Sequence, residues 1–165
     1  MKKTNTRDLT LMAVLTALSV VLAYIHVPTP TGYLTLLDVG IYFTAYYLGS
    51  KSGAIVGGLS SFLIDLLLGY PQYMFHSLIA HGAQGFFAGW NGKKRILGLV
   101  LASVSMIGWY FVAALLLGYG LGAAWAGILG NVLQNFFGMF VGYLVYLAYL
   151  RLKTLVYNEV KGGLT

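Results

Sequence analysis

The chain has 165 residues, enough for the single domain that we expect over residues 1–165, and 59% of them are hydrophobic while only 8% are charged. Soluble domains carry about 25% charged residues, so this composition excludes a water-exposed globular protein and indicates an integral membrane protein in a lipid bilayer. The net charge of +6 does not indicate a nucleic-acid partner, because the ten Lys and Arg residues lie in short flanks and loops, and the lack of cysteine excludes disulfides and thiolate metal ligands.

Six apolar runs, separated by charges and by Gly or Pro turns, follow one another along the chain. A transmembrane helix needs about 20 apolar residues, and about 17 suffice. The runs cover approximately residues 9–25, 36–48, 53–68, 73–90, 96–117 and 121–150. No small-residue cleavage site ends the first run, so we interpret it as a retained helix. The second run is short and either crosses incompletely or borrows the preceding GYLTL segment, whereas the sixth is longer than a membrane needs.

The basic residues all fall in alternate connections between these runs. They are Lys2, Lys3 and Arg7 before the first run, Lys51 before the third, Lys93, Lys94 and Arg95 before the fifth, and Arg151, Lys153 and Lys161 after the sixth. Since basic loops stay on the cytoplasmic side, we predict an all-α membrane protein with six transmembrane helices and with its N- and C-termini in the cytoplasm. The connections HVPTPTGYLTL, GYPQ and GYGLG then face outward.

Polar and aromatic side chains gather in the outer half of these predicted helices. Asp38 opens the second run at its outer end, Asp65 lies four residues before Gly69, and His76 lies one turn into the fourth run. The remaining members of the set are Trp109 and Tyr110 in the fifth run and Trp125, Asn131 and Asn135 in the sixth. An ionisable residue at bilayer depth costs about 2.5–3.5 kcal/mol, so such residues usually face a protein interior or a cavity. We therefore predict a pocket that opens outward.

The composition of this outer half narrows the class of ligand. Aromatic side chains offer flat faces for stacking a ring, and a few polar groups fix its orientation. The outer half contains no Lys or Arg, although a site for an anionic ligand such as folate, biotin or pantothenate would normally supply one. We expect a small aromatic ligand that is neutral or cationic.

Several of these residues have a purely structural alternative. Asp38 is also a favourable N-cap for the second helix, and Asp65 would equally serve as a buried acid bonded to Ser, Tyr or His. His81 and Gln84 are three residues apart on one face of the fourth run, which favours interhelical hydrogen bonds over ligand contacts. A second hypothesis is accordingly a structural or scaffolding membrane protein without a ligand, whose polar groups hold its helices together.

Motifs for catalysis and nucleotide binding are missing from the sequence. It contains no Gly-x-Ser-x-Gly elbow, no His-Glu-x-x-His helix and no phosphate-cradling loop with a lysine. His76 and His81 are five residues apart and point to different helix faces, so we expect no metal site. An intramembrane enzyme that uses Asp65 and a histidine would lack a nucleophile. We expect no enzymatic activity.

Small residues recur at four-residue spacing. The glycine pairs Gly53/Gly57, Gly85/Gly89 and Gly138/Gly142 predict close helix packing. In the first run, the segment MAVLTALS carries Ala13 and Ala17 behind a basic N-terminus. With six short spans and an outward pocket, the chain resembles the substrate-binding S components of energy-coupling factor (ECF) vitamin transporters over nearly its whole length. The segment YLTLLDVGIYFTAYYLGSKSGAIVGGLSSFLIDLLLGYPQYMFHSLIAHGAQGFFAG resembles the subgroup associated with hydroxymethylpyrimidine, a thiamine precursor, or with pyridoxine.

This resemblance implies a function and a set of partners. The vitamin would bind from outside at high affinity, with the first outer loop, residues 26–37, as a lid and Tyr33 as its best candidate contact. Ala13 and Ala17 would dock on a transmembrane coupling subunit, which works with two cytoplasmic ATPases. The loaded S component would topple in the membrane and release its ligand inside. ATP would be used by the partner subunits, this chain would carry no cofactor, and its location would be the prokaryotic plasma membrane, as a multi-pass protein.

Overall fold

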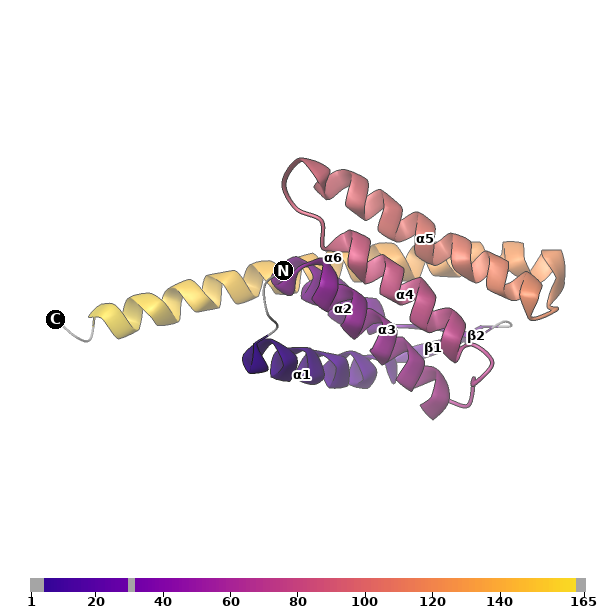
Figure 1. Ribbon diagram of the computed structural model, residues 1–165, viewed down its shortest axis with the longest axis horizontal. Coiled ribbons are helices and arrows are strands. Elements are labelled where there is room, and N and C mark those ends of the chain that lie inside the picture. The colour runs from indigo at the N-terminus through magenta and orange to yellow at the C-terminus, as the bar shows by residue number, and fades with distance from the viewer. Residues whose placement is uncertain (1–4, 30–31, 163–165) are drawn as a thin grey trace.

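The computed structural model describes residues 5–29 and 32–162, and the basic residues Lys2 and Lys3 of the topology prediction lie outside these ranges. Within the described residues the chain forms six α-helices, one β-hairpin and one short 3₁₀ turn (Figure 1). In chain order these are α1 (Thr6–Ala23), β1 (His26–Thr29), β2 (Gly32–Thr35), α2 (Leu37–Leu48), α3 (Ser50–Leu67), α4 (Met74–Ala88), η1 (Gly92–Lys94), α5 (Arg95–Leu116) and α6 (Gly120–Gly162). Each predicted apolar run is a helix, which confirms the all-α membrane fold.

The helices differ in length because they differ in surroundings. Three described helical segments are long and apolar enough to cross a membrane, namely Thr6–Ala23, Gly92–Leu116 and Gly120–Glu159. By contrast, α2 has 12 residues and α4 has 15. Helix α2 lies at the centre of the bundle, where it packs against α1, α3, α4 and α6 and buries Ile41, Tyr42 and Ala45 completely. Protein rather than lipid surrounds α2, so its polar side chains meet partners on neighbouring helices.

Glycines bring the central helices close together, as their spacing predicts. A Cβ placed on Gly85 of α4 would lie 2.1 Å from the carbonyl oxygen of Gly53 on α3, and one on Gly57 would lie 2.4 Å from the carbonyl oxygen of His81. On the other side of the bundle, a Cβ on Gly138 of α6 would lie 2.2 Å from Cβ of Asp38. Only glycine permits these approaches, which hold α3, α4 and α6 against the polar residues of the core.

The first outer connection is a hairpin rather than an irregular loop. Strands β1 and β2 pair antiparallel, with Val27 opposite Leu34 and Pro28 opposite Tyr33. The hairpin lies at the end of the bundle where α3 passes to α4 and α5 passes to α6 (Figure 1). Its short strands leave a sequence signal too brief to separate from a loop, which is why sequence analysis did not predict them.

The described basic residues occupy the opposite end of the bundle. Arg7 opens α1, Lys51 opens α3, and η1 with Arg95 opens α5. Helix α6 has 43 residues, about 65 Å at 1.5 Å per residue, and it continues beyond the predicted residue 150 to Gly162. Its final turns extend past the rest of the bundle at this end (Figure 1). The two ends of the bundle therefore differ sharply in charge.

Candidate ligand-binding site

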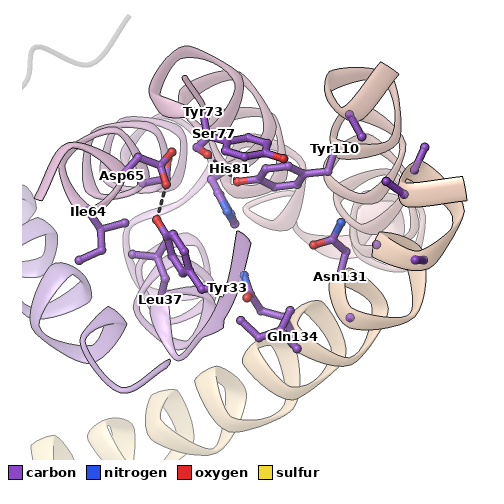
Figure 2. A pocket seen from close by; sticks show the side chains of 18 residues that line it. Tyr33, Leu37, Ile64, Asp65, Tyr73, Ser77, His81, Tyr110, Asn131 and Gln134 are labelled. Atoms are coloured by element: carbon purple, nitrogen blue, oxygen red, sulfur yellow. Dashed lines mark hydrogen bonds between the residues drawn. The ribbon is translucent and has the colours of Figure 1, made fainter. Parts of the chain in front are cut away.

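A cavity of about 130 Å³ lies beneath the hairpin, between α3, α4, α5 and α6 (Figure 2). Its walls combine aromatic, aliphatic and uncharged polar side chains with one carboxylate. The lining residues are Tyr33, Leu34, Leu37, Ser61, Ile64, Asp65, Tyr73, Ser77, His81, Tyr110, Ala114, Ala123, Ala124, Ala126, Gly127, Gly130, Asn131 and Gln134. None of these residues is Lys or Arg, so the walls favour a ligand that is neutral or cationic.

The hairpin is tied to α3 by a hydrogen bond over the cavity. The Tyr33 hydroxyl donates to Oδ1 of Asp65, as the dashed line in Figure 2 marks. Burial, and then the charge of nearby Asp65, raise the pKa of the Tyr33 phenol, so this hydroxyl keeps its proton and remains the donor. The Tyr33 ring also packs against Tyr70, with 4.9 Å between ring centroids, and against His26, with 5.8 Å.

One oxygen of the Asp65 carboxylate can accept a hydrogen bond from a further partner. Asp65 is 4% exposed, and its Oδ2 atom has no hydrogen-bond partner among the described residues. A buried carboxylate oxygen without a donor is costly, and a ligand N–H or O–H would satisfy it. On the neighbouring helices, the hydroxyls of Ser77 on α4 and Tyr110 on α5 lie 2.7 Å apart and offer further polar atoms.

A buried polar network forms the floor of the cavity on its α2 side. Gln84 on α4 is fully buried, and its Nε2 donates to Oδ2 of Asp38 at 2.9 Å and to Oδ1 of Asn135 at 2.9 Å. Its Oε1 atom lies 2.7 Å from Nδ1 of His81, and the same nitrogen lies 3.3 Å from Oδ1 of Asp38. Asp38 and Asn135 are also fully buried. The Asp38 carboxylate therefore has donors around it, although no Lys or Arg among the described residues forms an ion pair with it.

Two side chains connect this network to the rest of the fold. Asn135 accepts from the Tyr42 hydroxyl at 2.6 Å and donates to Oγ of Ser103 on α5 at 2.7 Å. Gln134 on α6 accepts from the backbone N–H of Thr35 at 2.8 Å and donates to Oδ1 of Asp38 at 3.3 Å. The second connection joins strand β2 directly to the buried carboxylate. The cavity roof and the cavity floor are thus held by one continuous set of hydrogen bonds.

The sequence-predicted residues fall into three groups in space. Tyr33, Asp65, Tyr110 and Asn131 line the cavity together (Figure 2). The next group lies one layer deeper, in the network of the floor, and consists of Asp38 and Asn135. The capping alternative for Asp38 is wrong, because Leu36 is the N-cap of α2 and the side chain that accepts from the first backbone N–H of this helix, that of Leu37, is Thr35. The structural alternative for Asp65 stays open, since its carboxylate is bonded to Tyr33.

The third group, His76, Trp109 and Trp125, lies outside the cavity lining. His76 and Trp109 pack together with 6.1 Å between ring centroids. His76 comes one residue before Ser77 and Trp109 one residue before Tyr110, so each is turned by about 100° from the face that meets the cavity. The Trp125 side chain is 62% exposed and packs against Phe111 instead.

Several cavity residues were not predicted as ligand contacts. His81 follows Ser77 by four residues, and Ser61 precedes Asp65 by four, so each pair shares one helix face. Gln134 similarly lies three residues after Asn131 on α6. The spacing from the predicted Asp65 and Asn131 is the signal that could have found Ser61 and Gln134, whereas Ser77 and His81 share a face of α4 that no predicted residue occupies. The prediction of interhelical hydrogen bonds is confirmed for Gln84, which donates to Asp38 and Asn135, whereas the hydrogen bond of His81 is to Gln84 on the same helix and His81 also lines the cavity.

A second, apolar groove of about 640 Å³ runs between α1 and α3 on the flank of the bundle. Ala13 and Ala17, singled out by their spacing, both line it and are exposed. The other lining residues are Leu9, Met12, Thr16, Val20, Val21, Ile55, Leu59, Leu63, Leu66 and Leu67. Because the alanine side chains are small, a helix from another protein could approach the α1 backbone closely at this groove.

Comparisons with known proteins identify the relatives of this chain. The profile of the family described as "ECF-type riboflavin transporter, S component" matches residues 3–151. The chain is 42% identical over 142 residues to the thiamine precursor transporter HmpT of Lactococcus lactis subsp. cremoris, a match that covers 84% of each protein. It is 32% identical over 127 residues to an uncharacterised protein of Pyrococcus woesei, covering 73% of this chain and 84% of that one. Its fold matches the solved S component of a bacterial ECF transporter with a TM-score of 0.68 and 24% identity, covering 91% of this chain and 97% of the other.

Proposed function

This chain belongs to the family of ECF-type transporter S components, and on that premise we propose that it binds a thiamine precursor of the hydroxymethylpyrimidine type and delivers it into the cell. The observation that carries the proposal is the cavity beneath the hairpin, in which an acidic and aromatic wall lacks any Lys or Arg. Hydroxymethylpyrimidine is an uncharged or weakly basic ring with amino and hydroxymethyl groups. Such a ring supplies donors for a carboxylate and a flat face for tyrosine side chains.

The positions of the polar groups support a single small ring. Asp65 has an unpartnered Oδ2 atom that would accept from a ligand N–H or O–H. Tyr33 and Tyr110 stand on opposite sides of the space between Asp65 and Asn131 (Figure 2). A cavity of about 130 Å³ suits one ring better than the three fused rings of riboflavin, the vitamin in the family description. The thiamine precursor transport of the 42% identical relative points the same way.

The β1–β2 hairpin acts as the lid of this site. Two contacts keep it closed, the Tyr33 hydrogen bond to Asp65 and the Thr35 hydrogen bond to Gln134. The basic residues at the opposite end of the bundle support a cytoplasmic location for that end and for both termini, because basic segments are retained there. The lid and its cavity then face the outside of a prokaryotic plasma membrane.

The groove between α1 and α3 is the docking surface for the transmembrane coupling subunit. Ala13 and Ala17 leave room there for a close, reversible helix contact. In ECF transporters the coupling subunit works with two ATPases, so the partners would use the ATP and this chain would need no cofactor. Binding and docking thus use separate surfaces of the same chain.

Calorimetry and thermal unfolding of the purified protein test the proposed ligand. We expect hydroxymethylpyrimidine to bind and to raise the unfolding temperature, with pyridoxine weaker and riboflavin without effect. Mass spectrometry of small molecules that co-purify with the protein provides an unbiased check. If no aromatic vitamin or precursor binds, the proposal fails and the scaffolding alternative takes its place.

A further inference from the structure

The arrangement of donors and acceptors in the buried network determines which ring nitrogen of His81 carries the hydrogen. Gln84 Nε2 contacts two atoms that only accept hydrogen bonds, the Asp38 carboxylate oxygen and Oδ1 of Asn135. Asn135 is oriented in turn, because the Ser103 hydroxyl donates to the carbonyl oxygen of Leu99 and therefore accepts from Nδ2 of Asn135, which leaves Oδ1 to accept from Tyr42. The Gln84 side chain therefore has to present its Oε1 atom to His81. That oxygen also only accepts, so the hydrogen of the 2.7 Å contact sits on Nδ1 of His81.

The other ring nitrogen of His81 is available to the cavity. His81 is 2% exposed to solvent, yet it lines the cavity, and Figure 2 shows its ring projecting from α4 into the space between Tyr33 and Tyr110. In a neutral imidazole with the hydrogen on Nδ1, Nε2 is a hydrogen-bond acceptor. Which ring nitrogen carries the hydrogen is set by the hydrogen-bond partners of the ring, so the tautomer depends on the partner that the protein provides.

We propose that His81 accepts a hydrogen bond from the ligand through Nε2, and that Gln84 and Asp38 are positioning residues that hold its ring with Nδ1 protonated. The inference rests on the proposed function, which it extends to a second polar contact. Asp65 on α3 and His81 on α4 then offer two acceptors to the same ring. A ligand with two separate donor groups, such as an amino group and a hydroxymethyl group, satisfies both. A ring with one donor leaves one acceptor unpaired.

A cycle of protein and ligand changes tests the contact to the ligand. His81→Asn keeps a donor at the position of Nδ1 and removes Nε2. Binding of hydroxymethylpyrimidine would be compared with binding of its deamino analogue and of its methyl analogue, which lacks the hydroxyl. One of the two analogues lacks the donor that faces His81 on α4. In the wild type, the loss of this donor is expected to weaken binding about tenfold, and this cost is expected to vanish in His81→Asn. Equal costs in both proteins for both analogues would overturn the inference.

Nitrogen-15 NMR of histidine-labelled protein tests the positioning role without any ligand. The His81 signals are assigned by their loss in His81→Asn, and their shifts report which ring nitrogen carries hydrogen. We expect Nδ1 protonated and Nε2 unprotonated in the wild type, with this preference reduced in Gln84→Met, which preserves side-chain length and leaves Asp38 as the acceptor near Nδ1. An Nε2-protonated ring in the wild-type protein overturns the inference even if the variant fails to fold.

The two arms separate this inference from the proposed function. If the wild type binds none of the precursors, the proposed function fails, and the tautomer measurement still reads the positioning of His81. If the wild type binds hydroxymethylpyrimidine and His81→Asn binds it equally well with unchanged analogue costs, the inference alone fails.

Discussion

We predict that the hydroxyl of Tyr33 controls how fast the proposed ligand leaves. Tyr33→Phe removes the hydrogen bond to Asp65 while keeping the ring contacts with Tyr70 and His26. The second tether, from Thr35 to Gln134, remains and keeps the hairpin folded. A hydrogen bond to a charged group contributes about 1.5–3 kcal/mol. On the proposal that the ligand leaves only after the hairpin opens, this bond breaks before release, and its loss is expected to raise the dissociation rate by roughly 10- to 150-fold.

The assay is exchange of bound radiolabelled hydroxymethylpyrimidine against excess unlabelled ligand, on protein in lipid nanodiscs. Tyr70→Phe is the matched control, since the Tyr70 ring lies 4.9 Å from that of Tyr33 at the same end of the bundle. We expect the control to exchange within about twofold of the wild type. A Tyr33→Phe protein that exchanges as slowly as this control refutes the reasoning, because the hairpin would then open without breaking the bond to Asp65.

Three further predictions concern the site, the network and the groove. Asp65→Ala is expected to weaken ligand binding by about 10- to 100-fold in calorimetry, whereas Trp125→Ala, 62% exposed and outside the cavity, leaves affinity within about twofold; the reverse ranking would contradict the placement of the site. Asn135→Leu leaves Gln84 with one acceptor fewer and Tyr42 without one, so stability in denaturant titration should fall by about 1–3 kcal/mol; an unchanged midpoint would show that the network is not stabilising. Ala13→Trp or Ala17→Trp should abolish uptake into cells while ligand binding is retained, and Val14→Trp, exposed but outside the groove, should leave uptake intact; loss of binding in the alanine variants would argue against a docking role.

Charge and hydrophobicity predicted the bundle because membrane insertion depends on them directly. The positions of Arg7, Lys51 and Arg95 at alternate helix starts identified every connection at the basic end. The hairpin was missed since four-residue strands give too little alternation to recognise. Nothing in the one-dimensional pattern revealed that α2 is enclosed by four other helices.

The rotation of each helix was the harder quantity to predict. Depth in the membrane selected Tyr110 and Trp109 alike, yet only Tyr110 meets the cavity. Adjacent residues on a helix differ by about 100° in direction, and their depth in the membrane does not determine that angle. On α4 the predicted His76 lies next to the face that Ser77 and His81 share, and no predicted residue marked that face. Asp38 was predicted as a pocket residue. In the structure it lies in the buried network, where Gln84 on α4 and Gln134 on α6 donate to it, and this role depends on the packing of those helices.

A structure of the protein with bound hydroxymethylpyrimidine tests the central claim most directly. We predict ligand density beneath the hairpin, with the ring between Tyr33 and Tyr110 and one donor within hydrogen-bond distance of Oδ2 of Asp65. Density on another surface of the bundle, or a ligand ring that leaves Asp65 without a donor, would contradict the account.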